Sequence, residues 1–177
     1  MKTGGSRSTH HDWAMDMDDM PANRRDAALS LMTTLGSEQI DALKEYFVQD
    51  DRVLLAFLFG SSAKGCAGLD SDVDVAIYLK HHAGDLQEKE AQRLSKTAHD
   101  IWVNLERIIG CEVDLVVLND AAATFVVSAL QGLPITIKDR NLYLDLLLKS
   151  TAEAADFREW VESYWQLKQR HAHATPA

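Results

Sequence analysis

Short apolar runs separated by polar segments are the main pattern in this chain. Runs at 53–59, 73–79 and 112–118 are bounded by polar or glycine residues, and their length and bounds are typical of buried β-strands. A fourth strand is expected at 134–137, where Pro134 favours the edge of a sheet because proline cannot donate a hydrogen bond to a neighbouring strand. The pattern therefore predicts four short strands.

Apolar residues at helical spacing fill the segments between these strands. Before the C-terminal segment we expect helices near 38–49 with Ser37 as N-cap, at 86–108, and from a cap at Asn119 or Asp120 to Gln131. Helices that alternate with strands indicate an α/β fold.

The chain of 177 residues favours one folded domain. We expect a flexible polar leader at 1–22, the domain at 23–138, a C-terminal helix at 139–170 and a tail at 171–177. The C-terminal helix carries an apolar stripe with two possible roles. The stripe covers the domain's own core, forms a partner-binding face, or does both over different parts of the helix, since aromatic side chains contribute strongly to interfaces. The stripe consists of Leu142, Leu146, Phe157, Trp160, Val161, Tyr164 and Leu167.

Two aspartates separated by one residue open the second apolar run. Asp72 and Asp74 are expected to point to one face of the strand, because strand side chains alternate. Such carboxylates are costly to bury without a cation, and paired Asp oxygens suit Mg²⁺. Asp114 can stand beside them if the run at 112–118 is the neighbouring strand. Three acids of this kind can hold two Mg²⁺ ions, and the third can take a proton from a nucleophile.

A Gly-Ser pair ends the first apolar run, ten residues before the aspartates. A turn at Gly60-Ser61 would present backbone N–H groups and a hydroxyl to a phosphate chain. A calcium loop is excluded, because Val75 and His81 stand where that loop needs Gly and Glu. A Walker A loop is also excluded, because Cys66 occupies the lysine position.

The string GSSAKG…DSDVDVAI resembles the signature of the DNA polymerase beta-type nucleotidyltransferase superfamily, and within it the minimal nucleotidyltransferase (MNT) branch. The resemblance covers about residues 38–143. It implies a mixed β-sheet with flanking helices, Mg²⁺ as cofactor and ATP as substrate. The implied site has phosphate contacts at Gly60 and Ser61, metal ligands at Asp72, Asp74 and Asp114, and Lys64 either on phosphate or merely solvated.

Members of the MNT branch are commonly antitoxins paired with HEPN-family ribonuclease toxins. The resemblance therefore implies transfer of AMP from ATP to a tyrosine of a cognate HEPN toxin. Two alternatives stay open. One is a transferase for a small hydroxyl compound such as an aminoglycoside, and the other is a non-catalytic antitoxin that neutralises its partner by occlusion.

Charge and composition narrow the choice of partner. The formal net charge of −9 disfavours stable binding to nucleic acid, which basic surfaces hold, and it suits a basic protein partner. No segment approaches the roughly 20 apolar residues of a membrane span. The two cysteines, Cys66 and Cys111, form no disulfide framework and are expected to be free thiols. We therefore expect a cytoplasmic protein.

Overall fold

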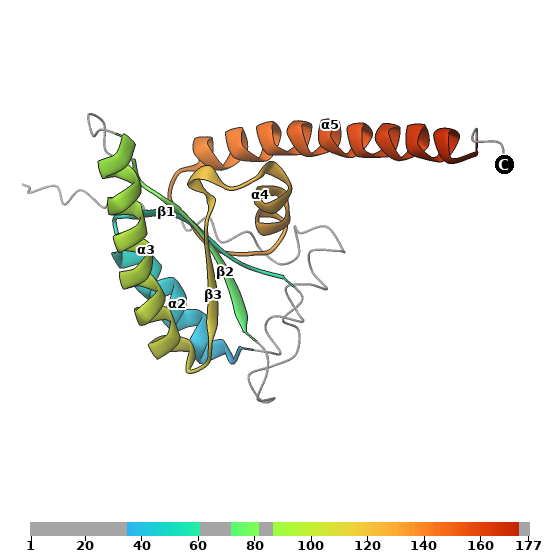
Figure 1. Ribbon diagram of the computed structural model, residues 1–177. Coiled ribbons are helices and arrows are strands. Elements are labelled where there is room, and N and C mark those ends of the chain that lie inside the picture. The colour runs from blue at the N-terminus through green and yellow to red at the C-terminus, as the bar shows by residue number, and fades with distance from the viewer. Residues whose placement is uncertain (1–34, 61–71, 82–86, 174–177) are drawn as a thin grey trace, which may run out of the picture.

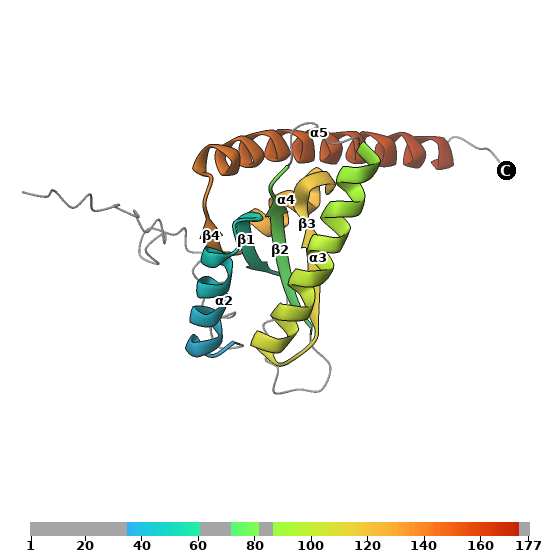
Figure 2. The same ribbon diagram turned by 90° about the vertical axis from the view of Figure 1, so that its left-hand side faces the viewer.

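The computed structural model describes residues 35–60, 72–81 and 87–173. They form a four-stranded sheet with helices on both faces (Figures 1 and 2). In chain order the elements are α2 (Ser37–Gln49), β1 (Val53–Phe59), β2 (Val73–Leu79), α3 (Gln87–Ile109), β3 (Val113–Val117), the short 3-10 helix η2 (Leu118–Asp120), α4 (Ala123–Leu130), β4 (Leu133–Ile137) and α5 (Arg140–His173). The predicted leader at 1–22 and the tail beyond residue 173 lie outside the described residues.

The sheet is mixed and has the strand order β3-β2-β1-β4. β1 runs antiparallel to both β2 and β4, whereas β2 and β3 run parallel. The parallel pair is possible because α3 carries the chain from the end of β2 back to the start of β3 (Figure 1). β4 lies at an edge, as predicted for the strand that contains Pro134. The predicted α/β class with a mixed sheet and flanking helices is confirmed.

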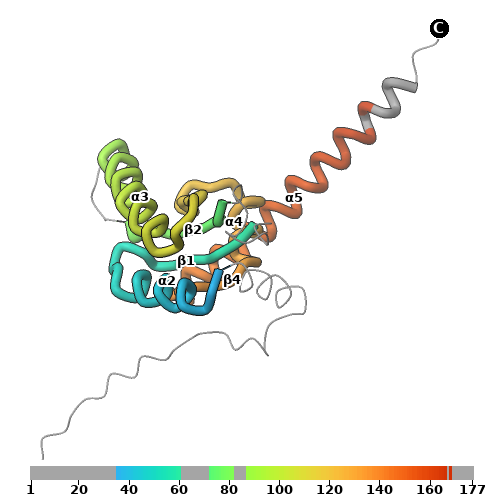
Figure 3. Tube along the Cα trace, turned by 90° about the horizontal axis from the view of Figure 1, so that it is seen from below, coloured from blue at the N-terminus to red at the C-terminus, as the bar shows by residue number. Residues whose placement is uncertain are grey.

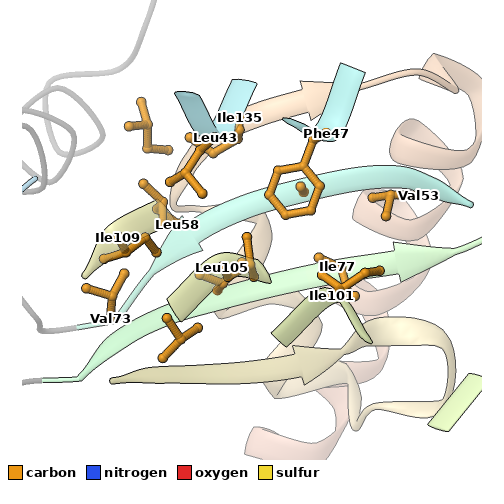
Figure 4. Close-up of a cluster of buried hydrophobic side chains, with 14 of the residues drawn as sticks. Leu43, Phe47, Val53, Leu58, Val73, Ile77, Ile101, Leu105, Ile109 and Ile135 are labelled. Carbon is orange, nitrogen blue, oxygen red and sulfur yellow. The ribbon is translucent and has the colours of Figure 1, made fainter. Parts of the chain in front are cut away.

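One face of the sheet packs against α2 and α3. Phe47 of α2 and Ile101 and Leu105 of α3 are fully buried there against Leu58 and Ile77 of the two central strands (Figure 4). These positions follow the 3.6-residue period of the helices and the two-residue period of the strands. The alternation therefore assigns odd-numbered positions of β2, from Val73 to Leu79, to this core.

The opposite face of the sheet packs against α4 and the first part of α5. Phe57 of β1 and Ala76 of β2 meet Val126 and Leu130 of α4 in a second buried cluster. Tyr143 of α5 stacks on Phe57, with ring centroids 6.1 Å apart. The even-numbered positions of β2 consequently belong to the α4 and α5 side, and this assignment decides where Asp74 points.

Two predicted helix caps are wrong, and hydrogen bonds explain each of them. α2 begins at Ser37, and the Gln39 side chain accepts a hydrogen bond from the Gly36 N–H at 2.9 Å, so Ser37 is not the cap. Asn119 does not cap α4 either. Its side chain instead binds Leu79, accepting from the backbone N–H at 2.9 Å and donating to the carbonyl at 2.8 Å. α4 starts later, after Ala122.

The C-terminal helix α5 extends well beyond the body of the protein (Figure 3). Its first part packs on the second cluster, and the last buried position is Ala154. Beyond it, Phe157, Trp160 and Tyr164 are exposed. The inner part of the stripe therefore covers the domain's own core, and the outer part is exposed.

Cys111 corrects the expectation of a free thiol, since it is disulfide-bonded in the structure. Cys66, the only other cysteine of the sequence, lies outside the described residues.

Candidate functional site

The parallel register of β2 and β3 brings two of the predicted acids side by side. Asp74 is the register partner of Asp114. Because side chains alternate along a strand, both carboxylates lie on the α4 and α5 side of the sheet, the side that also takes Ala76 and Val116. Asp74 is partly buried and Asp114 is exposed. The strands thus form a carboxylate pair at one end of the sheet.

Asp72 is exposed and directly precedes β2, two residues before Asp74. As the described residues stand, it does not join Asp74 and Asp114 in a three-acid metal site. The Val73 N–H donates to the Glu112 carbonyl at 3.0 Å, which extends the pairing of the two strands to the residues beside Asp72. Glu112 was not among the predicted site residues, and it contributes only its backbone carbonyl to this contact.

Gly60 touches the carboxylate pair from β1. Its φ of +86° places it in the left-handed region, which favours glycine. A Cβ added at this position would lie 2.0 Å from Asp74 Oδ2 and 2.7 Å from Asp74 Cγ. Phe59, just before it, is the register partner of Asp74. The backbone of Gly60 therefore approaches the Asp74 carboxylate more closely than a residue with a Cβ could.

The donor set fits Mg²⁺ without forming a complete cage. Asp74 and Asp114 supply paired carboxylate oxygens, and Gly60 leaves open the space that a Cβ would fill beside Asp74. Among the described residues, no group of three or more His, Cys, Asp or Glu side chains lies close enough to hold a metal ion. Mg²⁺ is usually held by one or two carboxylates together with substrate phosphates and water. Two paired carboxylates are therefore the most that the described residues offer to such an ion.

The remaining predicted site residues and a surface pocket lie apart from the carboxylate pair. Ser61 and Lys64 fall outside the described residues. A pocket of about 300 Å³ opens near the other end of β3, lined by Val117, Asp120 and Leu94 among others. None of the predicted site residues lines it. The pair at Asp74 and Asp114 thus lies apart from this pocket, with Asp114 exposed and Asp74 partly buried.

No helix among the described residues is long and apolar enough to cross a membrane. No curated protein matches the chain.

Several solved structures of toxin–antitoxin complexes are similar to the chain. A toxin–antitoxin structure with AMP-PNP has 19% identity and a TM-score of 0.47, over 79% of this chain and 100% of that chain. A structure of the toxin–antitoxin MntA-HepT has 17% identity and a TM-score of 0.46, over 77% and 97%. A tri-AMPylated Shewanella oneidensis HEPN toxin in complex with an MNT antitoxin has 16% identity and a TM-score of 0.46, over 76% and 99%. The site assignment does not rest on these likenesses.

The match to a protein family is independent of those structures. The model of the family described as "Polymerase beta, Nucleotidyltransferase" matches residues 41–141, more than half of the chain. The matched segment contains Gly60, Asp72, Asp74 and Asp114, and the fold brings Gly60, Asp74 and Asp114 together at one end of the sheet. The chain belongs to the polymerase beta nucleotidyltransferase family.

Proposed function

We propose that the protein is an antitoxin that transfers AMP from ATP to a tyrosine hydroxyl of a cognate HEPN-family toxin and thereby neutralises it. The observation that carries the proposal is the register pairing of Asp74 with Asp114, with Gly60 against Asp74. Membership of the nucleotidyltransferase family supports the reaction class. The MNT-like string around these residues supports the choice of a protein acceptor.

The reaction joins the acceptor to the α-phosphate of ATP. The tyrosine oxygen attacks the α-phosphorus, the bond from that phosphorus to the bridging oxygen breaks, and pyrophosphate leaves. The hydroxyl proton passes to a carboxylate, for which Asp114 is the proposed acceptor because it is exposed beside Asp74. Asp72, Asp74 and Asp114 are the proposed ligands of Mg²⁺, and because only Asp74 and Asp114 are paired in the structure, binding would draw the Asp72 side chain toward them. When bound, Mg²⁺ would neutralise charge on the phosphates and on the reacting oxygens.

Phosphate binding is proposed for the residues around the end of β1. The backbone at Gly60 has the conformational freedom to turn sharply beside the carboxylates. Ser61 and Lys64 follow directly and are proposed to contact the β- and γ-phosphates. Nucleotidyl transfer depends mainly on positioning and charge stabilisation, so these contacts would align the triphosphate for attack.

A non-catalytic antitoxin is the second candidate, and one observation favours it. The outer part of α5 exposes Phe157, Trp160, Tyr164 and Trp165, a surface that could block a partner without any chemistry. The two functions differ in what the carboxylates do. Catalysis requires them, whereas occlusion does not. In either case we propose a cytoplasmic protein that binds no nucleic acid stably.

The test mixes the protein with Mg²⁺, ATP and the purified product of the adjacent reading frame, and measures the intact mass of that product. The proposal predicts a gain of one or more AMP masses, localised to tyrosine by peptide fragmentation. The Asp72→Ala, Asp74→Ala variant should add none while keeping the circular dichroism spectrum of the wild type. An unmodified partner whose toxicity this variant still blocks would establish occlusion instead.

A further inference from the structure

The side of α5 that packs on the body continues past the point where the body ends. On the inner part of the helix, the side facing α4 and the sheet includes Leu142 and Leu146, and beside them a line of four residues at spacings of four, three and four: Tyr143, Leu147, Ser150 and Ala154. All four are buried or partly buried. This alternation of three and four keeps one line of a helix turned toward a packed neighbour. We call this line of positions the seam.

The seam keeps the same spacing over the next part of the helix. Three residues after Ala154 comes Phe157, followed by Val161, Tyr164 and Lys168, at spacings of four, three and four. Here the large side chains are solvent-exposed, 56% for Phe157 and 43% for Tyr164. Figures 1 and 3 show this part of α5 standing clear of the other described elements. This helix face has the spacing of a packed face, yet among the described residues no other element packs against it.

Aromatic side chains concentrate on and beside this outer seam. Trp160 and Trp165 neighbour the seam positions Val161 and Tyr164 and are 62% and 55% exposed. Trp160 stacks on Phe157 and on Tyr164, with ring centroids 6.1 Å and 5.8 Å apart. Ring stacking restricts these side chains before any partner arrives, so binding would cost less side-chain entropy. Exposed, pre-ordered tryptophan and tyrosine are the residue types most enriched in interface hot spots.

Charge separates the two kinds of occupant that could cover this face. Residues 157–168 contain two acidic and two basic side chains, whereas the whole chain carries −9. A second copy would bring two acidic proteins together, at an electrostatic cost. A partner with basic side chains around an apolar strip would instead be attracted. The three-four spacing is the one that helices use when they pack along one another, which favours a helix as the covering element.

From these observations we infer that the outer seam of α5, residues 157–168, docks an amphipathic helix of a basic partner protein, which packs there as α4 packs on the inner seam. The inference rests on the proposed function for the choice of partner. It adds the surface that holds that partner, away from the carboxylate pair at the end of the sheet.

The test measures binding of the adjacent-frame product to the full chain by isothermal titration calorimetry. Trp160→Ser, Tyr164→Ser should raise the Kd at least 100-fold. Leu148→Ser is the matched control, because Leu148 is on the same helix, is 71% exposed and lies off the seam, and it should leave the Kd unchanged. Hydrogen exchange on the wild-type complex should show protection of the amides of 157–168. The Kd should rise between 0.1 and 0.5 M salt, since the attraction is partly electrostatic.

Each of the following results would refute one part of the proposal. Absence of wild-type binding, or a double variant within threefold of the wild-type Kd, refutes docking at the seam. Sedimentation that shows a dimer of the chain alone, abolished by the double variant, identifies a second copy as the occupant. The proposed function is tested separately in the same samples. Docking without AMP transfer refutes the function alone, and transfer at the wild-type rate by the double variant refutes the docking surface alone.

Discussion

Replacement of Gly60 by alanine perturbs the proposed active site at a single atom. The added Cβ would lie 2.0 Å from Asp74 Oδ2, whereas real Cβ atoms essentially never come closer than 3.0 Å to such a neighbour. The Asp74 carboxylate must therefore move by about 1 Å, or the backbone at the end of β1 must move instead. The φ of +86° adds backbone strain for any residue with a Cβ.

The two consequences have different magnitudes. Backbone strain in the left-handed region costs about 1–2 kcal/mol of folding free energy. That loss lowers the melting temperature by a few degrees in a domain of this size. Displacement of a catalytic group by about 1 Å can cost about 100-fold in rate. We therefore expect Gly60→Ala to be a folded protein with modestly lower stability and about 100-fold lower kcat/KM for AMP transfer.

Gly110→Ala provides the matched control. Gly110 has a similar φ of +81°, but an added Cβ there meets nothing within 4 Å. It should lose comparable stability in urea denaturation and keep full activity. AMP transfer is followed by intact mass, and Mg²⁺-ATP affinity by calorimetry. Wild-type transfer by Gly60→Ala, or an equal loss of transfer in both variants, would refute the role of Gly60 beside Asp74.

Three further predictions concern charge and hydrogen bonding. Burial raises the pKa of Asp50, but hydrogen bonds from the Arg52 side chain and amide outweigh it and hold that pKa below 3.8. The stabilisation that Asp50→Asn removes should be full above pH 4 and vanish as pH falls through the lowered pKa; an undiminished difference in unfolding free energy at pH 2 contradicts this. Asn119→Ala should lower the unfolding free energy by about 1–3 kcal/mol in urea, because the Leu79 N–H loses its acceptor; a loss below about 0.5 kcal/mol speaks against it. Asp114→Asn should raise the metal-free melting temperature, because it removes one of two adjacent like charges. It should also reduce the further rise with Mg²⁺ and ATP, and scanning fluorimetry showing the opposite changes would count against the carboxylate pair.

The strands could be predicted closely because their signal is local. The runs at 53–59 and 73–79 have the bounds of β1 and β2, since each is apolar throughout its buried side and ends at a polar residue or glycine. The pairing of Asp74 with Asp114 was only conditional, because it depends on which strands become neighbours. Which strand lies beside β2 depends on how α3, a helix of 23 residues, packs against the sheet, and no short sequence motif indicates this packing.

Two of the wrong predictions share one physical cause, a bonding partner that the local sequence does not indicate. Asn119 has the residue type of a helix cap, yet it binds the backbone of Leu79, 40 residues away. Cys111 likewise has a disulfide partner, where its spacing in the sequence indicated a free thiol. The apolar stripe of α5 could not be divided from sequence either. The seam of α5 keeps the same three-four spacing on both sides of Ala154, and only the position of α4 determines which part of the helix is covered.

The most direct test of the central claim follows the phosphate that is transferred. In the proposed reaction, the pair Asp74 and Asp114 directs attack on the α-phosphorus of ATP. ATP labelled at the α-phosphate should label the adjacent-frame product, ATP labelled at the γ-phosphate should not, and Asp74→Asn and Asp114→Asn should each abolish the label while remaining folded. Label from the γ-phosphate, or wild-type labelling by either variant, would contradict the account.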